Sequence, residues 1–305
     1  MVVKKALRRS LAQVRHVTPV PPGAARGLVA DVYAQVERDF GMLAPPVALH
    51  SAAPEVMAGV WMLLRESLLA QGLVSRAAKE LVATEVSRAN ACPYCVDVHG
   101  ATLRGLGGPA PAMPEPGPEV IGTRLTFHYL NRMVNVFLGE SPLPPAVPGA
   151  VRGGALRVLG SMMGSSARRS RPPGDSLGLL PDAPLPADLH WAEGNPYVAG
   201  AVARATAAVS QAGERSVPEP VRELVTAEVA KWDGTPPGPS RAWCEDAVAA
   251  LAPAHRPTGR LALLTAMASY QAGTAVGDVQ ADDRGLLEIT AWASMVAARA
   301  RSGGS

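Results

Sequence analysis

The chain has 305 residues, and 48% of them are hydrophobic, which is enough apolar material to bury a core without disulfide bonds. The formal charge of +3 is small, and the basic residues form no stripe with interleaved aromatic residues, so we do not expect a nucleic-acid partner. No apolar stretch follows the basic start, and no window of about 18 residues is apolar enough to span a bilayer, so we expect a cytoplasmic protein that does not enter a membrane.

Apolar residues recur at helical spacing along most of the chain, and no alternating run bounded by turn signals predicts a strand. We therefore expect an all-α fold. Ser75 is suited to cap one helix, and Pro218 is suited to the first turn of another. The expected helices, in chain order, span residues 27–40, 54–71, 75–90, 92–106, 119–138, 195–212, 218–231, 241–251, 256–271 and 282–301.

Glycine and proline interrupt the helical pattern at residues 105–118 and 161–186, and the second stretch is also basic, as expected for a solvated, mobile linker. Residues 79–87 line up with residues 222–230 as a weak internal repeat, but no cysteine follows the second copy. If the repeat is real, the second copy has kept the scaffold and lost the dithiol. We expect a redox-active helical domain at 1–160, a Pro/Arg/Gly-rich linker at 161–186, and a degenerate helical repeat at 187–305.

Cys92 and Cys95 form a C-x-x-C motif, and His99 follows four residues later. If the segment after Ala91 is helical, these three side chains lie on one face of the helix. The chain has only 3 cysteines, so we expect no structural disulfide framework. In a reducing compartment the motif indicates redox chemistry or metal binding, and His99 gives the dithiol its own proton acceptor.

A thiol must lose its proton before it attacks, and its unperturbed pKa is about 8.5. The unpaired N–H groups of a helix that starts near Pro93 favour an anion, and His99 can take the proton of Cys95. Glu80 can orient the imidazole if its helix packs antiparallel to the cysteine helix. We therefore expect Cys95, the deeper cysteine, to be the nucleophile and Cys92, at the exposed helix tip, to resolve the intermediate.

The spacing of Glu80, Cys92, Cys95 and His99 resembles the signature of the alkylhydroperoxidase D (AhpD) branch of the carboxymuconolactone decarboxylase-like proteins, and residues 128–135 look like the helix that follows in related chains. The resemblance implies an AhpD-like helical fold without cofactor or metal. It implies a peroxidase for organic hydroperoxides, reset by a dihydrolipoyl group on a partner protein or by another dithiol. Cys95 would be the peroxidatic cysteine, Cys92 the resolving cysteine, and Glu80 with His99 the proton relay.

The chain departs from well-known members of this branch in two ways. Tyr94 stands where they carry a histidine between the cysteines, and the chain extends well beyond a single-domain member. Proteins that decarboxylate carboxymuconolactone generally lack the cysteine pair, so lactone decarboxylation is the weaker of the family's chemistries for this chain.

Other interpretations of the motif stay open. The C-x-x-C and His99 could form part of a zinc site completed by Glu80 or His128, although no second C-x-x-C exists. The dithiol could also sense oxidation in a non-enzymatic interaction protein that signals through residues 161–186. We otherwise expect His128 in the core or an interface, Cys244 as a small buried hydrophobe, and a homo-oligomer built on the long apolar helices.

Overall fold

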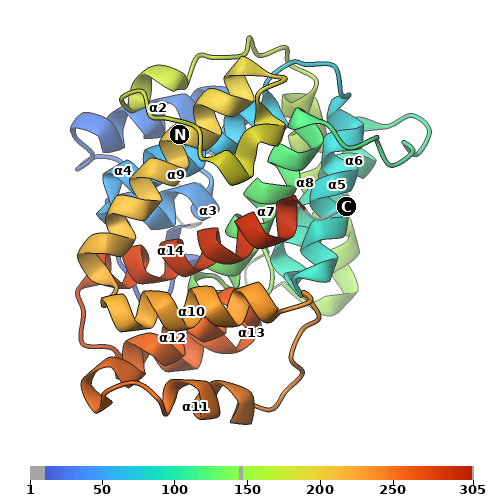
Figure 1. Cartoon of the computed structure of the whole chain (residues 1–305). Coiled ribbons are helices and arrows are strands. Elements are labelled where there is room, and N and C mark those ends of the chain that lie inside the picture. Colours follow the sequence, from blue (N-terminus) through green and yellow to red (C-terminus); the bar gives the residue numbers. More distant parts are fainter. Residues whose placement is uncertain (1–10, 144–146, 304–305) are drawn as a thin grey trace.

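The computed structural model describes residues 11–143 and 147–303. Within these ranges the chain forms helices and loops and no strand, which confirms the all-α fold (Figure 1). No helix in the same ranges is both long and apolar enough to cross a membrane. The α-helices are α2 (Gly27–Phe40), α3 (Pro45–Ala48), α4 (Pro54–Leu64), α5 (Arg76–Ala89), α6 (Pro93–Leu106), α7 (Pro118–Phe137), α8 (Gly149–Ala167), α9 (Pro196–Ser216), α10 (Glu219–Lys231), α11 (Ala242–Val248), α12 (Arg256–Met267), α13 (Ser269–Ala272) and α14 (Asp283–Ser302). The short 3-10 or π-helical turns are η1 (Leu11–Gln13), η2 (Leu49–Ala52), η3 (Arg65–Leu69), η4 (Leu177–Leu179), η5 (Ala187–Ala192), η6 (Pro253–His255) and η7 (Gly273–Asp278).

The expected helices are present, with two interruptions. The helix expected at 54–71 is α4 followed by the π-helical turn η3. The helix expected at 256–271 breaks at Ala268, whose backbone leaves the helical region (φ −142, ψ 52), and continues as α13. Ser75 caps α5 as predicted, since its side-chain oxygen accepts a hydrogen bond of 3.2 Å from the Ala78 N–H.

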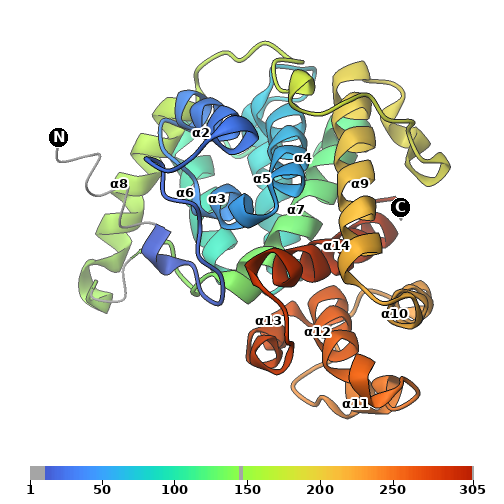
Figure 2. The same ribbon diagram turned by 90° about the vertical axis from the view of Figure 1, so that its left-hand side faces the viewer.

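One hydrophobic core joins the two halves of the chain. Helix α7 of the first half packs along α14 of the second, and α4 packs against α9 (Figure 2). Helices α10, α11 and α12 lie together at one end of the molecule in both views (Figures 1 and 2). The division into two repeats stays a prediction, because a shared core neither requires nor excludes a duplication.

Helix α8 is the largest element that the sequence pattern did not predict, and it runs through the expected boundary at residue 160. It contains several glycines, which have a low intrinsic helix propensity. In the structure they let α8 pack closely on α6, because a Cβ on Gly160 would meet the backbone of Ala101, and a Cβ on Gly105 would meet the carbonyl of Gly160. The small residues therefore serve a close helix crossing.

The segment after α8 is not the free, solvated linker that its composition predicted. Arg171 is only 5% exposed, and its Nε donates a hydrogen bond of 2.9 Å to the carbonyl of Asp39. The buried carboxylate of Glu66 accepts hydrogen bonds from the Gly174 N–H at 2.7 Å and from the Ser176 hydroxyl at 2.6 Å. These contacts hold the segment against the first half of the chain.

Candidate active site

The candidate site is built on α5 and α6, which are joined by a tight turn at residues 90–92. Ala91 in this turn has φ 49, in the left-handed region that residues with a Cβ rarely adopt. The turn reverses the chain, so α5 and α6 run antiparallel and Glu80 comes to lie beside His99. Pro93 occupies the first turn of α6, where its missing N–H costs no helical hydrogen bond.

The two sulfur atoms of the C-x-x-C motif are in direct contact. Cys92 Sγ and Cys95 Sγ lie 2.7 Å apart, and both residues are free cysteines. Cys92 is 1% exposed and Cys95 is 4% exposed, so the expectation of an exposed Cys92 at the helix tip was wrong. The tip is buried because the Cys92 N–H donates a hydrogen bond of 3.0 Å to the Ser87 carbonyl, which draws the residue onto α5.

Glu80 and His99 form a buried hydrogen-bonded pair. His99 Nδ1 lies 2.7 Å from Glu80 Oε2, and Arg76 contacts the other carboxylate oxygen at 2.6 Å. Burial alone would raise the pKa of the Glu80 carboxyl, but Arg76 and His99 together hold that pKa below its usual value. Since the carboxylate accepts the Nδ1 proton, Nε2 is the ring nitrogen left for proton exchange. The edge-on ring of Phe127, 4.5 Å away between centroids, fixes the imidazole from the side.

The Cys95 thiol needs help to ionise. Burial raises the pKa of Cys95 well above its usual value, and the neighbouring Cys92 raises it further, whereas the side chain of Asn131 lowers it. Among the described residues no hydrogen bond joins His99 to either sulfur. The structure thus places His99 on α6, one turn beyond Cys95, without a direct contact to either sulfur.

A polar network beside the dithiol was not predicted as part of the site. The Asn90 amide donates a hydrogen bond of 2.9 Å to Asn131 Oδ1, and Asn131 Nδ2 donates one of 3.1 Å to the Ser87 hydroxyl. Asn90 also lies 3.1 Å from His128 Nδ1. Burial and the Arg132 charge hold the pKa of His128 well below its usual value, which favours a neutral imidazole. The similarity of residues 128–135 to the family was the available sequence signal for this network.

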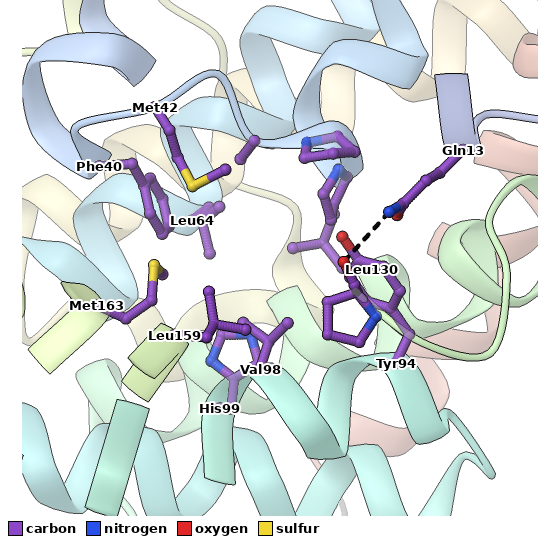
Figure 3. Close-up of a pocket in the computed structure, with 14 residues that line it drawn as sticks. Gln13, Phe40, Met42, Leu64, Tyr94, Val98, His99, Leu130, Leu159 and Met163 are labelled. Carbon is purple, nitrogen blue, oxygen red and sulfur yellow. Dashed lines mark hydrogen bonds between the residues drawn. The ribbon is translucent and has the colours of Figure 1, made fainter. Parts of the chain in front are cut away.

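An apolar cavity of about 110 Å³ lies beside His99 (Figure 3). Only Gln13, Tyr94 and His99 contribute polar side chains to its wall. The cysteines do not line the cavity, so a molecule bound there would contact the side chains of His99 and Tyr94 but neither sulfur. The apolar part of the wall consists of Phe40, Met42, Ala44, Pro45, Pro46, Leu64, Val98, Leu130, Pro142, Leu159 and Met163.

The remaining candidates for chemistry play no part in this site. Cys244 is fully buried, as expected, and burial raises the pKa of its thiol to about 12. In the described ranges no three His, Cys, Asp or Glu side chains are arranged to hold a metal ion. The zinc interpretation therefore lacks a set of ligands there.

The antiparallel helix pair with its dithiol falls inside a recognised family. Residues 54–111 match the carboxymuconolactone decarboxylase family, and this range includes Glu80, both cysteines and His99. The chain belongs to this family, in its AhpD-like part. It is 34% identical to the alkyl hydroperoxide reductase Rv2159c of Mycobacterium tuberculosis, in an alignment that covers 94% of this chain and 93% of that protein. No solved structure gives a significant match.

Proposed function

We propose that this protein is a thiol-dependent peroxidase that reduces organic hydroperoxides with the Cys92–Cys95 dithiol. One observation carries the proposal: two sulfurs 2.7 Å apart share a helix with His99, which is paired with Glu80 and lines an apolar cavity. The similarity to a protein named alkyl hydroperoxide reductase supports the same chemistry.

The proposed cycle starts at Cys95. Its thiolate attacks the outer oxygen of the hydroperoxide, the O–O bond breaks, and the alkoxide takes a proton and leaves as an alcohol. Cys95 is then a sulfenic acid. The sulfur of Cys92 attacks it, water leaves, and a disulfide forms without a large movement because the sulfurs are already in contact. An external dithiol reduces this disulfide by exchange and is itself oxidised to a disulfide.

His99 and Glu80 serve as the proton relay in this proposal. The burial that raises the pKa of Cys95 makes a base necessary, and an ionised Glu80 stabilises the imidazolium that forms when His99 accepts the proton. We assign the transfer to a bridging water molecule or to a small shift of the ring, since no direct hydrogen bond joins His99 to Cys95. The same imidazolium then protonates the departing alkoxide.

The substrate and the reductant follow from the surroundings of the site. An apolar cavity suits the organic part of an alkyl or aralkyl hydroperoxide. The family resemblance makes a dihydrolipoyl group on a partner protein the first candidate for the reductant, with other dithiols as alternatives. Because the cycle needs reduced thiols, we expect it to run in the cytoplasm, and we expect a homo-oligomer.

A turnover assay tests the proposal. The reduced protein is mixed with cumene hydroperoxide and dihydrolipoamide, and both alcohol formation and the mass of the peptide containing Cys92 and Cys95 are measured. We expect sustained turnover, a loss of two hydrogens that links the two cysteines, and no turnover in Cys95→Ser. Disulfide formation without turnover with any dithiol would instead support a redox sensor, and a tightly bound zinc ion would support the metal interpretation.

A further inference from the structure

A second and larger groove, of about 840 Å³, lies at the start of α6. Ala91 and Pro93, the chain neighbours of Cys92, are exposed and form part of its wall. The second half of the chain contributes Arg241 and Gln271 to the wall. The groove shares no lining residue with the apolar cavity beside His99. Two separate pockets of different polarity therefore lie beside the helix that carries the dithiol.

The groove carries excess positive charge. Arg15 and Arg241 line it, and Glu140 is the acidic residue in its wall. Arg241 donates hydrogen bonds to neutral acceptors: the backbone carbonyl of Gln271 and the hydroxyl of Thr274, both at 2.6 Å, and the side-chain Oε1 of Gln271 at 3.2 Å. Within the described ranges neither arginine forms an ion pair. Two arginines against one carboxylate leave an excess of positive charge at a concave surface, which attracts an anionic ligand.

The groove also leads toward Cys92. The side chain of Cys92 is 1% exposed, but the residues on either side of it face the groove. Ala91 holds a left-handed backbone conformation that is sparsely populated for a residue with a Cβ. Since Cys92 is buried, access to its sulfur from the groove side requires this turn to move.

We propose that this groove binds the reductant, and that the reductant is a low-molecular-weight dithiol carrying a carboxylate, which is one of the alternatives to a protein-bound dihydrolipoyl group. The proposal rests on the dithiol peroxidase function proposed above. The volume of about 840 Å³ is typical of sites for small molecules, and Arg15 and Arg241 supply the charge that a carboxylate needs. The groove lies between the two halves, which gives the second half a role in recognising the reductant.

The chemical step is thiol–disulfide exchange at Cys92. A thiolate of the reductant attacks Cys92 Sγ, the Cys92–Cys95 bond breaks, and Cys95 leaves as a thiolate. In the resulting mixed disulfide, the first sulfur of the reductant is bonded to Cys92 Sγ. The second thiol of the reductant attacks that first sulfur, closes a disulfide within the reductant and releases Cys92 as a thiolate. One dithiol is oxidised to a disulfide and one protein disulfide is reduced to a dithiol. A carboxylate held by the arginines would position the attacking sulfur.

The test compares dihydrolipoate with dihydrolipoamide, which carry the same dithiol and differ in a carboxylate against a neutral amide. The full-length protein is oxidised with diamide, so the test does not depend on peroxidase turnover. Reduction at low ionic strength is followed by alkylating the released thiols and measuring the mass of the protein. We expect dihydrolipoate to react about three- to tenfold faster, and the advantage to shrink when salt is added.

Three variants locate the effect. Arg15→Gln/Arg241→Gln should bring the ratio of the two rates close to one, because the dihydrolipoate rate falls more than the dihydrolipoamide rate. Arg15→Gln alone, at an exposed position, should lose part of the preference. Arg88→Gln/Lys231→Gln removes two exposed charges outside the groove and should keep the preference. Equal rates in the native protein, or an unchanged ratio in the groove variant, would overturn this proposal alone. Failure of diamide to link Cys92 and Cys95 would overturn the peroxidase proposal as well.

Discussion

Glu80 and His99 are 19 residues apart in the sequence and are joined by a hydrogen bond of 2.7 Å between Oε2 and Nδ1. The turn at residues 90–92 creates this contact by folding α6 back along α5. It places a buried, ionised carboxylate behind the imidazole that the cysteine helix presents to the cavity. The proposed chemistry depends on this pair.

Replacing Glu80 with glutamine should slow the oxidation of Cys95. The amide keeps the shape of the side chain but no longer stabilises the imidazolium, so we expect the rate with cumene hydroperoxide to fall by about 10- to 100-fold. Stopped-flow measurement of thiol oxidation tests this. Glu85→Gln, on the exposed side of the same helix, serves as the control and should leave the rate within about twofold.

The same carboxyl should make stability depend on pH. Its folded-state pKa lies below the value of 4.5 taken for the unfolded chain, so its contribution to stability is fully present above pH 4.5 and is lost as the pH falls through the folded-state pKa. Urea unfolding at a series of pH values should therefore show a steeper acid loss of stability in the native protein than in Glu80→Gln. Parallel curves would contradict the ionised, buried Glu80.

Removing Cys92 should trap the intermediate on Cys95. In Cys92→Ser no thiol remains to condense with the sulfenic acid, so treatment with one equivalent of hydroperoxide and dimedone should label Cys95. Peptide mass spectrometry identifies the labelled residue. In Cys95→Ser we expect no label at Cys92. The reverse pattern would exchange the roles of the two cysteines.

Filling the cavity should discriminate between hydroperoxides by size. Leu159 lines the cavity from α8 (Figure 3), so Leu159→Phe should lower kcat/KM for cumene hydroperoxide about tenfold and change that for hydrogen peroxide by less than about twofold. Val158→Phe, at the next position and 62% exposed, is the control and should change neither value. Equal losses for both substrates in Leu159→Phe would place the substrate elsewhere.

The crossing of α6 and α8 should depend on the absence of side chains. In Gly105→Ala the new methyl group would overlap the carbonyl of Gly160, and we expect a loss of about 3 kcal/mol or more in the free energy of unfolding. Gly153→Ala, in the partner helix α8, meets nothing within 4 Å and should be neutral or stabilise the protein by about 0.5–1 kcal/mol. Urea denaturation of both variants measures the contrast.

The sequence pattern predicted the helices that have one apolar face, and local motifs located the dithiol and the Glu80–His99 pair. It predicted the cap at Ser75 because capping is a local interaction. The pattern did not predict α8, because glycine has a low helix propensity. The close packing on α6 that these glycines allow is not visible in the sequence. The prediction that Cys92 is exposed was wrong, because the burial of this residue depends on how the turn before α6 folds onto α5. The pattern also missed that Arg171 is buried, since the acceptor for its side chain is the carbonyl of Asp39, 132 residues away.

The packing of α7 on α14 has a consequence for how the protein behaves on dilution. If this helix belonged to a separate chain, that chain would dissociate when the protein concentration fell below the dissociation constant of the complex. Here the covering helix is tethered by a covalent backbone, so its local concentration is fixed. Specific activity should therefore stay constant down to nanomolar enzyme, as far as this contact is concerned.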